Sequence, residues 1–194
     1  MLKLKQINLG LFIAIIAVNG YILAAPLLPR ISFWLQEQSG KRMSALTGKL
    51  HPPSIQNAPA IPKDNRLVIP TMLLDAKINE GPDLRAARTD TWRRPGTSTP
   101  DKGGNTVIVA HRFTYTNPRG TFYYLNKLKT GDEIGVFWQG KRYVYTVDDV
   151  RVVPPTEVGV EANTTNKQLT LYTCTPLWMP KDRLIIRATL KEYL

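Results

Sequence analysis

Three side chains that together can perform acyl transfer stand at the ends of predicted β-strands: Cys174, His111 and Arg183. Cys174 ends the strand-like run that begins at Gln168. His111 directly follows an apolar run ending at Ala110, and Arg183 opens the last strand-like run. A thiolate can attack a carbonyl carbon, an imidazole can move protons at an amine, and a guanidinium offers fixed donors to an oxyanion. Their combination on a rigid sheet predicts a cysteine-nucleophile site.

Each of these residues also has a purely structural interpretation when taken alone. Cys174 is the only cysteine, so it has no disulfide partner within the chain, and most single cysteines are buried as small apolar side chains. A lone histidine is usually satisfied or solvated, and so is an arginine on an edge strand. Strand alternation places Arg183 and Arg187 on one face, which makes both arginines candidate site residues. The prediction of a cysteine-nucleophile site therefore rests on the three residues together and not on any one of them.

The amino terminus predicts a membrane anchor within residues 1–30. Lys3 and Lys5 precede a largely apolar run from Ile7 to Leu28, which is long enough to cross a bilayer as a helix. Positive charge before the span predicts a cytoplasmic amino terminus, with the remainder of the chain outside. The competing interpretation is a signal peptide cleaved after Ala25, but the apolar stretch exceeds a typical signal core and Pro26 would follow the cut. An unpaired thiol outside the cytoplasm favours a reactive role.

Residues 31–65 predict an extracellular tether, because this segment is polar, irregular in pattern and rich in proline. Its start, from Phe33 through Trp34 to Leu35, is typical of a short helix at the outer head-group region. His51 lies in this segment and is followed by proline, so we expect no catalytic role for it.

Residues 66–194 have the size of one compact domain, and their pattern is mostly strand. Gln139-Gly140 is a two-residue hairpin signal between alternating strands. Short strands separated by turn signals favour a closed barrel or a sandwich with small helical insertions, and we expect helical turns at 82–88 and 121–128. The expected strands are 66–69, 72–78, 106–110, 133–138, 141–153, 169–174 and 184–190.

Several motifs, which occur along the chain in the same order as in that family, resemble those of the sortase family of membrane-anchored cysteine transpeptidases. Thr170 to Cys174 is similar to the Thr-Leu-x-Thr-Cys nucleophile motif, and Arg183 to Ile186 to the family's last strand with its arginine. Gly104 to Arg112 looks like the histidine motif, with Ala110 where many members have glycine. Gly120 to Ile134 resembles the linker into the next strand. The resemblance implies a mainly β fold: an eight-stranded sortase-type β-barrel with short helices, preceded by a transmembrane helix.

The resemblance also implies a reaction in two acyl transfers and a role for each site residue. Cys174 would attack the threonine carbonyl of a Leu-Pro-x-Thr-Gly-like sorting motif, giving a thioacyl intermediate. His111 would move protons at the leaving and incoming amines, Arg183 would hold substrate and stabilise the oxyanion, and Thr173 would line the pocket. The implied partners are surface proteins that bear the motif and an amine acceptor in a cell-wall precursor or pilin. No cofactor is implied.

The residues alone leave open the sortase subclass and the alternative functions. The stretch from Trp92 to His111 looks most like class D and E sortases, whereas Thr175-Pro176 after the cysteine also resembles class C. An L,D-transpeptidase is disfavoured, because that family packs its histidine and cysteine within a few residues. A catalytically inactive, membrane-tethered β-barrel that binds peptide or cell-wall polymer is the alternative function.

The net charge and the acidic residues add little to the prediction of function. Lys and Arg outnumber Asp and Glu by 26 to 15, for a net charge of +11, which suits a polyanionic surface such as lipid head groups or wall polymers. Nucleic acid is not expected, because the basic residues are scattered without an aromatic platform. No metal site is predicted, since the acidic residues of the one candidate calcium loop are too widely spread: Asp148, Asp149, Glu157 and Glu161.

Overall fold

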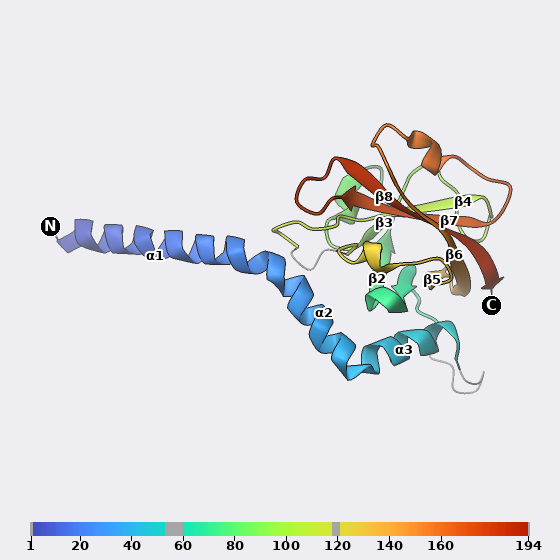
Figure 1. Cartoon of the computed structure of the whole chain (residues 1–194), viewed down its shortest axis with the longest axis horizontal. Helices are drawn as coiled ribbons and strands as arrows, with labels where there is room; N and C mark the ends of the chain where they lie inside the picture. Colours follow the sequence, from blue (N-terminus) through green and yellow to red (C-terminus); the bar gives the residue numbers. More distant parts are fainter. Residues whose placement is uncertain (1, 53–59, 118–120, 194) are drawn as a thin grey trace.

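The structure is a computed structural model that describes residues 2–52, 60–117 and 121–193. Its first part is a long helical arm that projects from a β-barrel (Figure 1). The arm comprises α1 (Leu2–Ala24), the 3-10 helix η1 (Ala25–Leu27), α2 (Leu28–Ser39) and α3 (Lys41–Leu50). The helical stretch Lys3–Ser39 has a mean hydropathy of 2.3 over its most apolar window, and almost none of that window is covered by protein. By length and composition it can span a membrane, as the sequence predicted.

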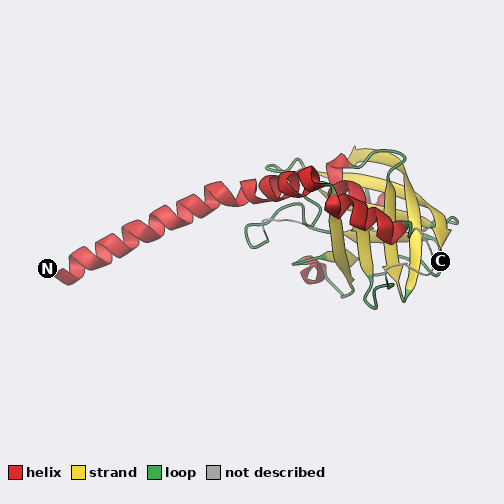
Figure 2. Cartoon of the chain, turned by 90° about the horizontal axis from the view of Figure 1, so that it is seen from below, coloured by secondary structure: helices red, strands yellow, loops and turns green. Residues whose placement is uncertain are grey.

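Residues 31–39 and 41–50 are helical, which corrects the expectation of an irregular tether, although the short helix expected at Phe33 to Leu35 is present within α2. The chain bends at Gly40, and α3 then lies along the outside of the barrel (Figure 2). Leu46 and Leu50 of α3 form a small buried cluster with three barrel residues, Val68, Phe137 and Val144. Gly135 allows this contact, because a Cβ there would lie 2.9 Å from a Leu50 methyl carbon. The arm is therefore packed against the barrel by apolar side chains.

Ion pairs add to this attachment of α3. Lys49 Nζ lies 2.5 Å from Asp75 Oδ2, and Arg66 Nε lies 2.6 Å from Asp75 Oδ1. Burial alone would raise the pKa of Asp75, but the hydrogen bonds from Lys49 and Arg66 outweigh it and lower the pKa. At the end of α3, His51 Nε2 lies 2.6 Å from Glu133 Oε2. His51 thus ties the arm to the barrel.

The β-rich prediction for the rest of the chain is confirmed. Within the described residues, eight strands close into one barrel in the order β1-β2-β3-β4-β7-β8-β6-β5. The strands are β1 (Arg66–Ile69), β2 (Leu74–Asn79), β3 (Thr91–Arg93), β4 (Asn105–Val109), β5 (Glu133–Trp138), β6 (Lys141–Val153), β7 (Gln168–Thr175) and β8 (Asp182–Tyr193). Short 3-10 helices interrupt them: η2 (Pro70–Met72), η3 (Leu84–Ala87), η4 (Leu125–Lys127) and η5 (Val158–Glu161).

The barrel interior is filled by apolar side chains from every part of this domain. Leu67, Ile108, Leu171 and Ile186 come from four different strands and are fully buried in the main core cluster, together with Phe122 from the segment after β4. Such dense packing fixes the strands relative to one another. The active-site candidates lie on β7 and β8 and directly after β4.

Boundaries differ from the predictions mainly at short elements. β1, β5 and β6 begin and end where the sequence predicted, and the Gln139-Gly140 hairpin connects β5 to β6. β3 was not predicted, because three residues are too few to show a period-2 pattern. β8 starts at Asp182, two residues earlier than expected, and pairs with both β6 and β7.

Candidate active site

Strand pairing brings Cys174, Arg183 and His111 to one end of the barrel. Cys174 of β7 lies directly opposite Arg183 of β8 in the antiparallel ladder. β4 and β7 run parallel, with Val109 beside Tyr172. His111 comes two residues after Val109, and Cys174 comes two residues after Tyr172. His111 therefore follows β4 at the same level along the sheet as Cys174. The strand-end placement predicted from the sequence therefore holds in the fold.

All four predicted site residues line one cavity of about 420 Å³. Cys174, His111 and Arg183 are partly exposed there, whereas Thr173 is buried. Arg187, the other candidate by parity, is absent from the described lining of this cavity. The remaining lining residues come from β3, the segment before η3, and the ends of β4 and β7: Pro82, Asp83, Trp92, Arg94, Val109, Ala110 and Tyr172.

The Thr173 hydroxyl fixes the position from which His111 leaves the sheet. Thr173 Oγ1 donates a hydrogen bond of 2.8 Å to the carbonyl oxygen of Ala110, and the threonine side chain is only 2% exposed. Because the hydroxyl is occupied by backbone, Thr173 offers its methyl group rather than a free donor to the cavity. Ala110, where many sortases have glycine, is itself buried beside this bond.

A second buried contact holds the loop between β6 and β7 near the cavity. The Asn105 side-chain amide donates to the carbonyl oxygens of Val160 and Ala162, at 3.1 and 3.0 Å. Thr170 Oγ1 in turn donates to Asn105 Oδ1 at 2.8 Å. Because these buried polar side chains have hydrogen-bond partners, they hold the loop in a defined position. They place Glu161, which stands between the two bonded carbonyls, toward the cavity wall.

Arg94, Glu161 and Tyr172 form a polar network at that wall which the sequence did not reveal. Arg94 Nε donates to both Glu161 carboxylate oxygens, at 2.9 and 3.1 Å, and the Tyr172 hydroxyl donates to Glu161 Oε1 at 2.5 Å. The Arg94 guanidinium also lies 5.2 Å from the Trp92 ring centroid. The hydrogen bond that Arg94 donates to Glu161 raises the pKa of Arg94, and burial, followed by the bond to Glu161, raises the pKa of Tyr172. Tyr172 therefore stays a neutral donor.

Arg112 places a second guanidinium beside the nucleophile. Its Nη1 donates to Thr175 Oγ1 at 2.7 Å and its Nη2 to Asn126 Oδ1 at 3.1 Å. Burial lowers the pKa of Arg112, while nearby Tyr123 and Cys174 act to raise it. The sequence signal for Arg112 was its place directly after His111 in the histidine motif. Together with Arg183, it places two guanidinium groups near Cys174.

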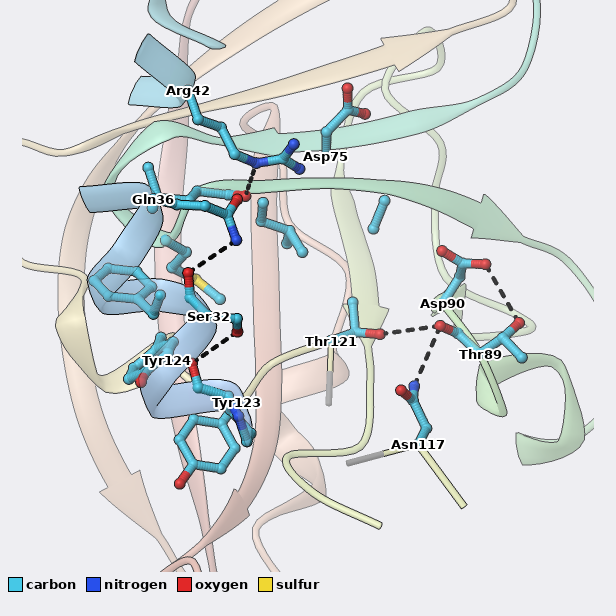
Figure 3. A pocket seen from close by; sticks show the side chains of 16 residues that line it. Ser32, Gln36, Arg42, Asp75, Thr89, Asp90, Asn117, Thr121, Tyr123 and Tyr124 are labelled. Atoms are coloured by element: carbon cyan, nitrogen blue, oxygen red, sulfur yellow. Dashed lines mark hydrogen bonds between the residues drawn. The ribbon is translucent and has the colours of Figure 1, made fainter. Parts of the chain in front are cut away.

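A larger cavity, of about 490 Å³, lies between α2 and the barrel (Figure 3). Its lining includes Arg42, whose Nε donates to the Leu73 carbonyl at 3.0 Å, and the carboxylates of Asp75 and Asp90. None of the candidate catalytic residues is among its described lining. The smaller cavity is therefore the candidate active site.

Asp148, Asp149 and Glu161 of the candidate calcium loop contact other side chains. Asp148 Oδ2 accepts a hydrogen bond from Thr189 at 2.5 Å, and Asp149 lies 3.5 Å from Arg151. Glu161 is bound by Arg94 and Tyr172. Across the residues that the structure describes, no three His, Cys, Asp or Glu side chains gather as a metal site would require.

Comparisons with known proteins agree on one family. A family model for the sortase domain matches residues 67–191. The chain is 34% identical over 106 residues to Sortase SrtE1 of Streptomyces coelicolor, a match that covers 50% of this chain but only 29% of that protein. The crystal structure of Sortase E1 from Streptomyces coelicolor superposes with a TM-score of 0.59 at 28% identity, covering 68% of this chain and 89% of the other.

A more distant likeness supports the fold alone. Sortase C of Streptococcus pneumoniae superposes with a TM-score of 0.60 at 24% identity, covering 69% of each chain. The family model covers well over half of the chain, including Cys174, His111 and Arg183. The chain belongs to the sortase family.

Proposed function

We propose that this protein is a membrane-anchored cysteine transpeptidase that cleaves a Leu-Pro-x-Thr-Gly-like sorting motif between threonine and glycine. The observation that carries the proposal is the single cavity lined by Cys174, His111 and Arg183. A nucleophile, a proton carrier and a fixed cationic donor around one space are the groups that acyl transfer from a peptide requires. Membership of the sortase family supports the same chemistry.

In the first step, the Cys174 thiolate attacks the carbonyl carbon of the threonine in the motif. The carbonyl π electrons move to oxygen, and Arg183, which faces Cys174 across the β7–β8 ladder, donates hydrogen bonds to the resulting oxyanion. When the tetrahedral intermediate collapses, the carbon–nitrogen bond breaks and protonated His111 gives its proton to the departing glycine amine. The product is a thioester between Cys174 and the threonine acyl group.

In the second step, an amine replaces the thiol. Neutral His111 accepts a proton from the incoming amine, whose nitrogen attacks the thioester carbonyl, and Cys174 departs as a thiolate. Thr173 serves as a positioning residue, because its bond to the Ala110 carbonyl fixes the backbone just before His111. The acceptor is an amine of a cell-wall precursor or a pilin.

The arrangement in the membrane follows from the amino terminus. Lys3 and Lys5 lie before the apolar helix, so we place the amino terminus in the cytoplasm and the barrel outside. Within the family we favour the class D and E groups, because the curated relative is a class E enzyme by name. The solved Sortase E1 is described with a tripeptide in its active site, which supports a peptide as the occupant of the cavity.

The test is peptide cleavage and ligation by the full chain in detergent. Quenched-fluorescent peptides that carry Leu-Pro-x-Thr-Gly or Leu-Ala-x-Thr-Gly are incubated with an amine acceptor, and products are separated by chromatography. We expect cleavage after threonine and a ligated product, both lost in Cys174→Ala. The ratio of the two peptides' kcat/KM values reports the preference at the second motif position.

Folding of Cys174→Ala is the control, because the sulfur lies at the rim of the core and its loss leaves the barrel intact. A folded wild-type chain that binds these peptides without cleaving them, with and without acceptor, would favour the alternative of an inactive peptide-binding barrel.

A further inference from the structure

Two loops that follow the candidate catalytic residues expose large apolar side chains. Tyr115 lies four residues after His111 and is 47% exposed. Trp178 and Met179 lie in the connection from β7 to β8, just after Cys174, and are 54% and 76% exposed. Side chains of this size and exposure on adjoining loops mark an interaction surface.

Phe113 joins the two loops into one surface. Its ring centroid lies 5.2 Å from that of Tyr115 and 5.6 Å from that of Trp178, both in edge-to-face geometry. We call the surface formed by Phe113, Tyr115, Trp178 and Met179 the aromatic face. Because Phe113 is packed between the loops, the aromatic face is held in one arrangement and does not depend on a single mobile side chain.

The aromatic face is continuous with the outer end of α1. The Tyr21 hydroxyl donates a hydrogen bond to the Tyr115 carbonyl oxygen, and the two rings lie 6.5 Å apart. Tyr123, which also packs against Phe113, has its hydroxyl 3.4 Å from the Pro26 carbonyl. In Figure 1 the segment after β4 and the β7–β8 loop both lie on the side of the barrel where α1 arrives.

Helix length sets the depth at which this junction lies. A helix of 23 residues is about 34 Å long, close to the roughly 30 Å hydrocarbon thickness of a bilayer. With α1 across the bilayer, Tyr21 falls near the boundary between acyl chains and head groups, where tyrosine and tryptophan are enriched. Tyr115, bonded to Tyr21, must lie at nearly the same depth.

We propose that the aromatic face docks on the interfacial region of the same bilayer that α1 spans. Tryptophan, tyrosine and methionine bury apolar surface among the upper acyl chains, while Lys181, exposed at the end of the same β7–β8 connection, stays at the level of anionic head groups. A bilayer is favoured over a protein partner, because α1 already brings the lipid surface to this face. The inference rests on the membrane anchoring of the proposed function.

Docking has a consequence for substrate access. The loops of the aromatic face continue directly from His111 and Cys174, so their insertion holds the cavity mouth close to the membrane surface. Polypeptides and amines that are themselves tethered to the bilayer would then reach Cys174 at a higher local concentration than free ones.

The experiment compares two labelled positions of equal exposure. Met179 and Val158 are each 76% exposed, but Val158 lies in η5, in the connection from β6 to β7, and not in either loop of the aromatic face. Met179→Cys and Val158→Cys are made in full-length Cys174→Ala, labelled with an environment-sensitive fluorophore and reconstituted in phosphatidylcholine–phosphatidylglycerol vesicles. Lipids with a nitroxide near the head group serve as quenchers. We expect at least about twofold stronger quenching, and a blue-shifted emission, at position 179.

Equal quenching at the two positions overturns the proposal. A second measurement guards against a labelled variant that misfolds: lipids brominated on the acyl chain should quench tryptophan fluorescence more in the unmodified chain than in Trp178→Phe. Neither readout requires catalysis or a particular orientation of the chain in the membrane. Failed peptide cleavage or reversed topology would therefore contradict the proposed function while leaving the docking result readable.

Discussion

The end of the barrel that carries the candidate active site and the helical arm are held in place by different interactions. Cys174, Arg183 and His111 are placed by the backbone ladders of β4, β7 and β8, which join segments far apart in the chain. α3 is held instead by side chains, namely the apolar cluster around Leu50 and the ion pairs nearby. Ladder bonds fix register along a whole strand, whereas side-chain contacts can be removed one at a time.

Because of this difference, activity and the attachment of the arm to the barrel can be disrupted by separate substitutions. A substitution at the cavity wall should lower activity and leave the free energy of unfolding nearly unchanged. A substitution between α3 and the barrel should lower the free energy of unfolding and leave activity nearly unchanged.

The largest expected effect is at Arg183, with Arg187 as the matched control on the same strand. Methionine keeps the aliphatic stem at each site and removes the guanidinium. Arg183→Met should lower kcat/KM by about 100-fold or more, because an oxyanion donor is lost. Arg187→Met should change it by less than about threefold, because Arg187 does not line the described cavity. Steady-state cleavage of the sorting peptide measures both, and equal losses would remove the role proposed for Arg183.

The next effect is on stability, at Leu50. Leu50→Ala opens a space against Gly135 and should lower the free energy of unfolding by about 2–4 kcal/mol, with kcat/KM unchanged. Val158→Ala, at an exposed position, should change it by less than about 0.5 kcal/mol. Thermal unfolding of the full chain in detergent compares the two. A Leu50→Ala chain that loses activity while keeping its stability would show that the arm shapes the active site.

The smallest effect is the pH dependence of the contact between His51 and Glu133. Burial would raise the pKa of Glu133, but hydrogen bonds from Lys191 and His51 lower it overall. A carboxyl with a depressed folded-state pKa adds stability above its unfolded pKa of about 4.3, and this is lost as the pH falls through the folded value. Glu133→Gln should therefore lower Tm by about 1–3 °C at pH 7 and make little difference near pH 3. A pH-independent difference would rule out this ionic contribution.

The sequence predicted the candidate active site better than the arm, for physical reasons. β5 and β6 were found because a hairpin signal separates two alternating runs, and the strand-end positions of Cys174, His111 and Arg183 were predicted because a strand end is a local feature. The packing of α3 was not found, since Leu46 and Leu50 meet partners on β1, β5 and β6 that no local pattern connects to them. The bond between Arg94 and Glu161 was missed for the same reason: its two ends come together only in the closed barrel.

We would first measure the intact mass of the full chain, quenched in acid during turnover of the sorting peptide. We expect the mass to increase by that of the acyl portion ending at threonine, less the thiol hydrogen that it replaces. The increase should be absent in Cys174→Ala and should disappear when an amine acceptor is added before quenching. An unmodified wild-type chain that nevertheless cleaves the peptide, or the same adduct on Cys174→Ala, would contradict a reaction through Cys174.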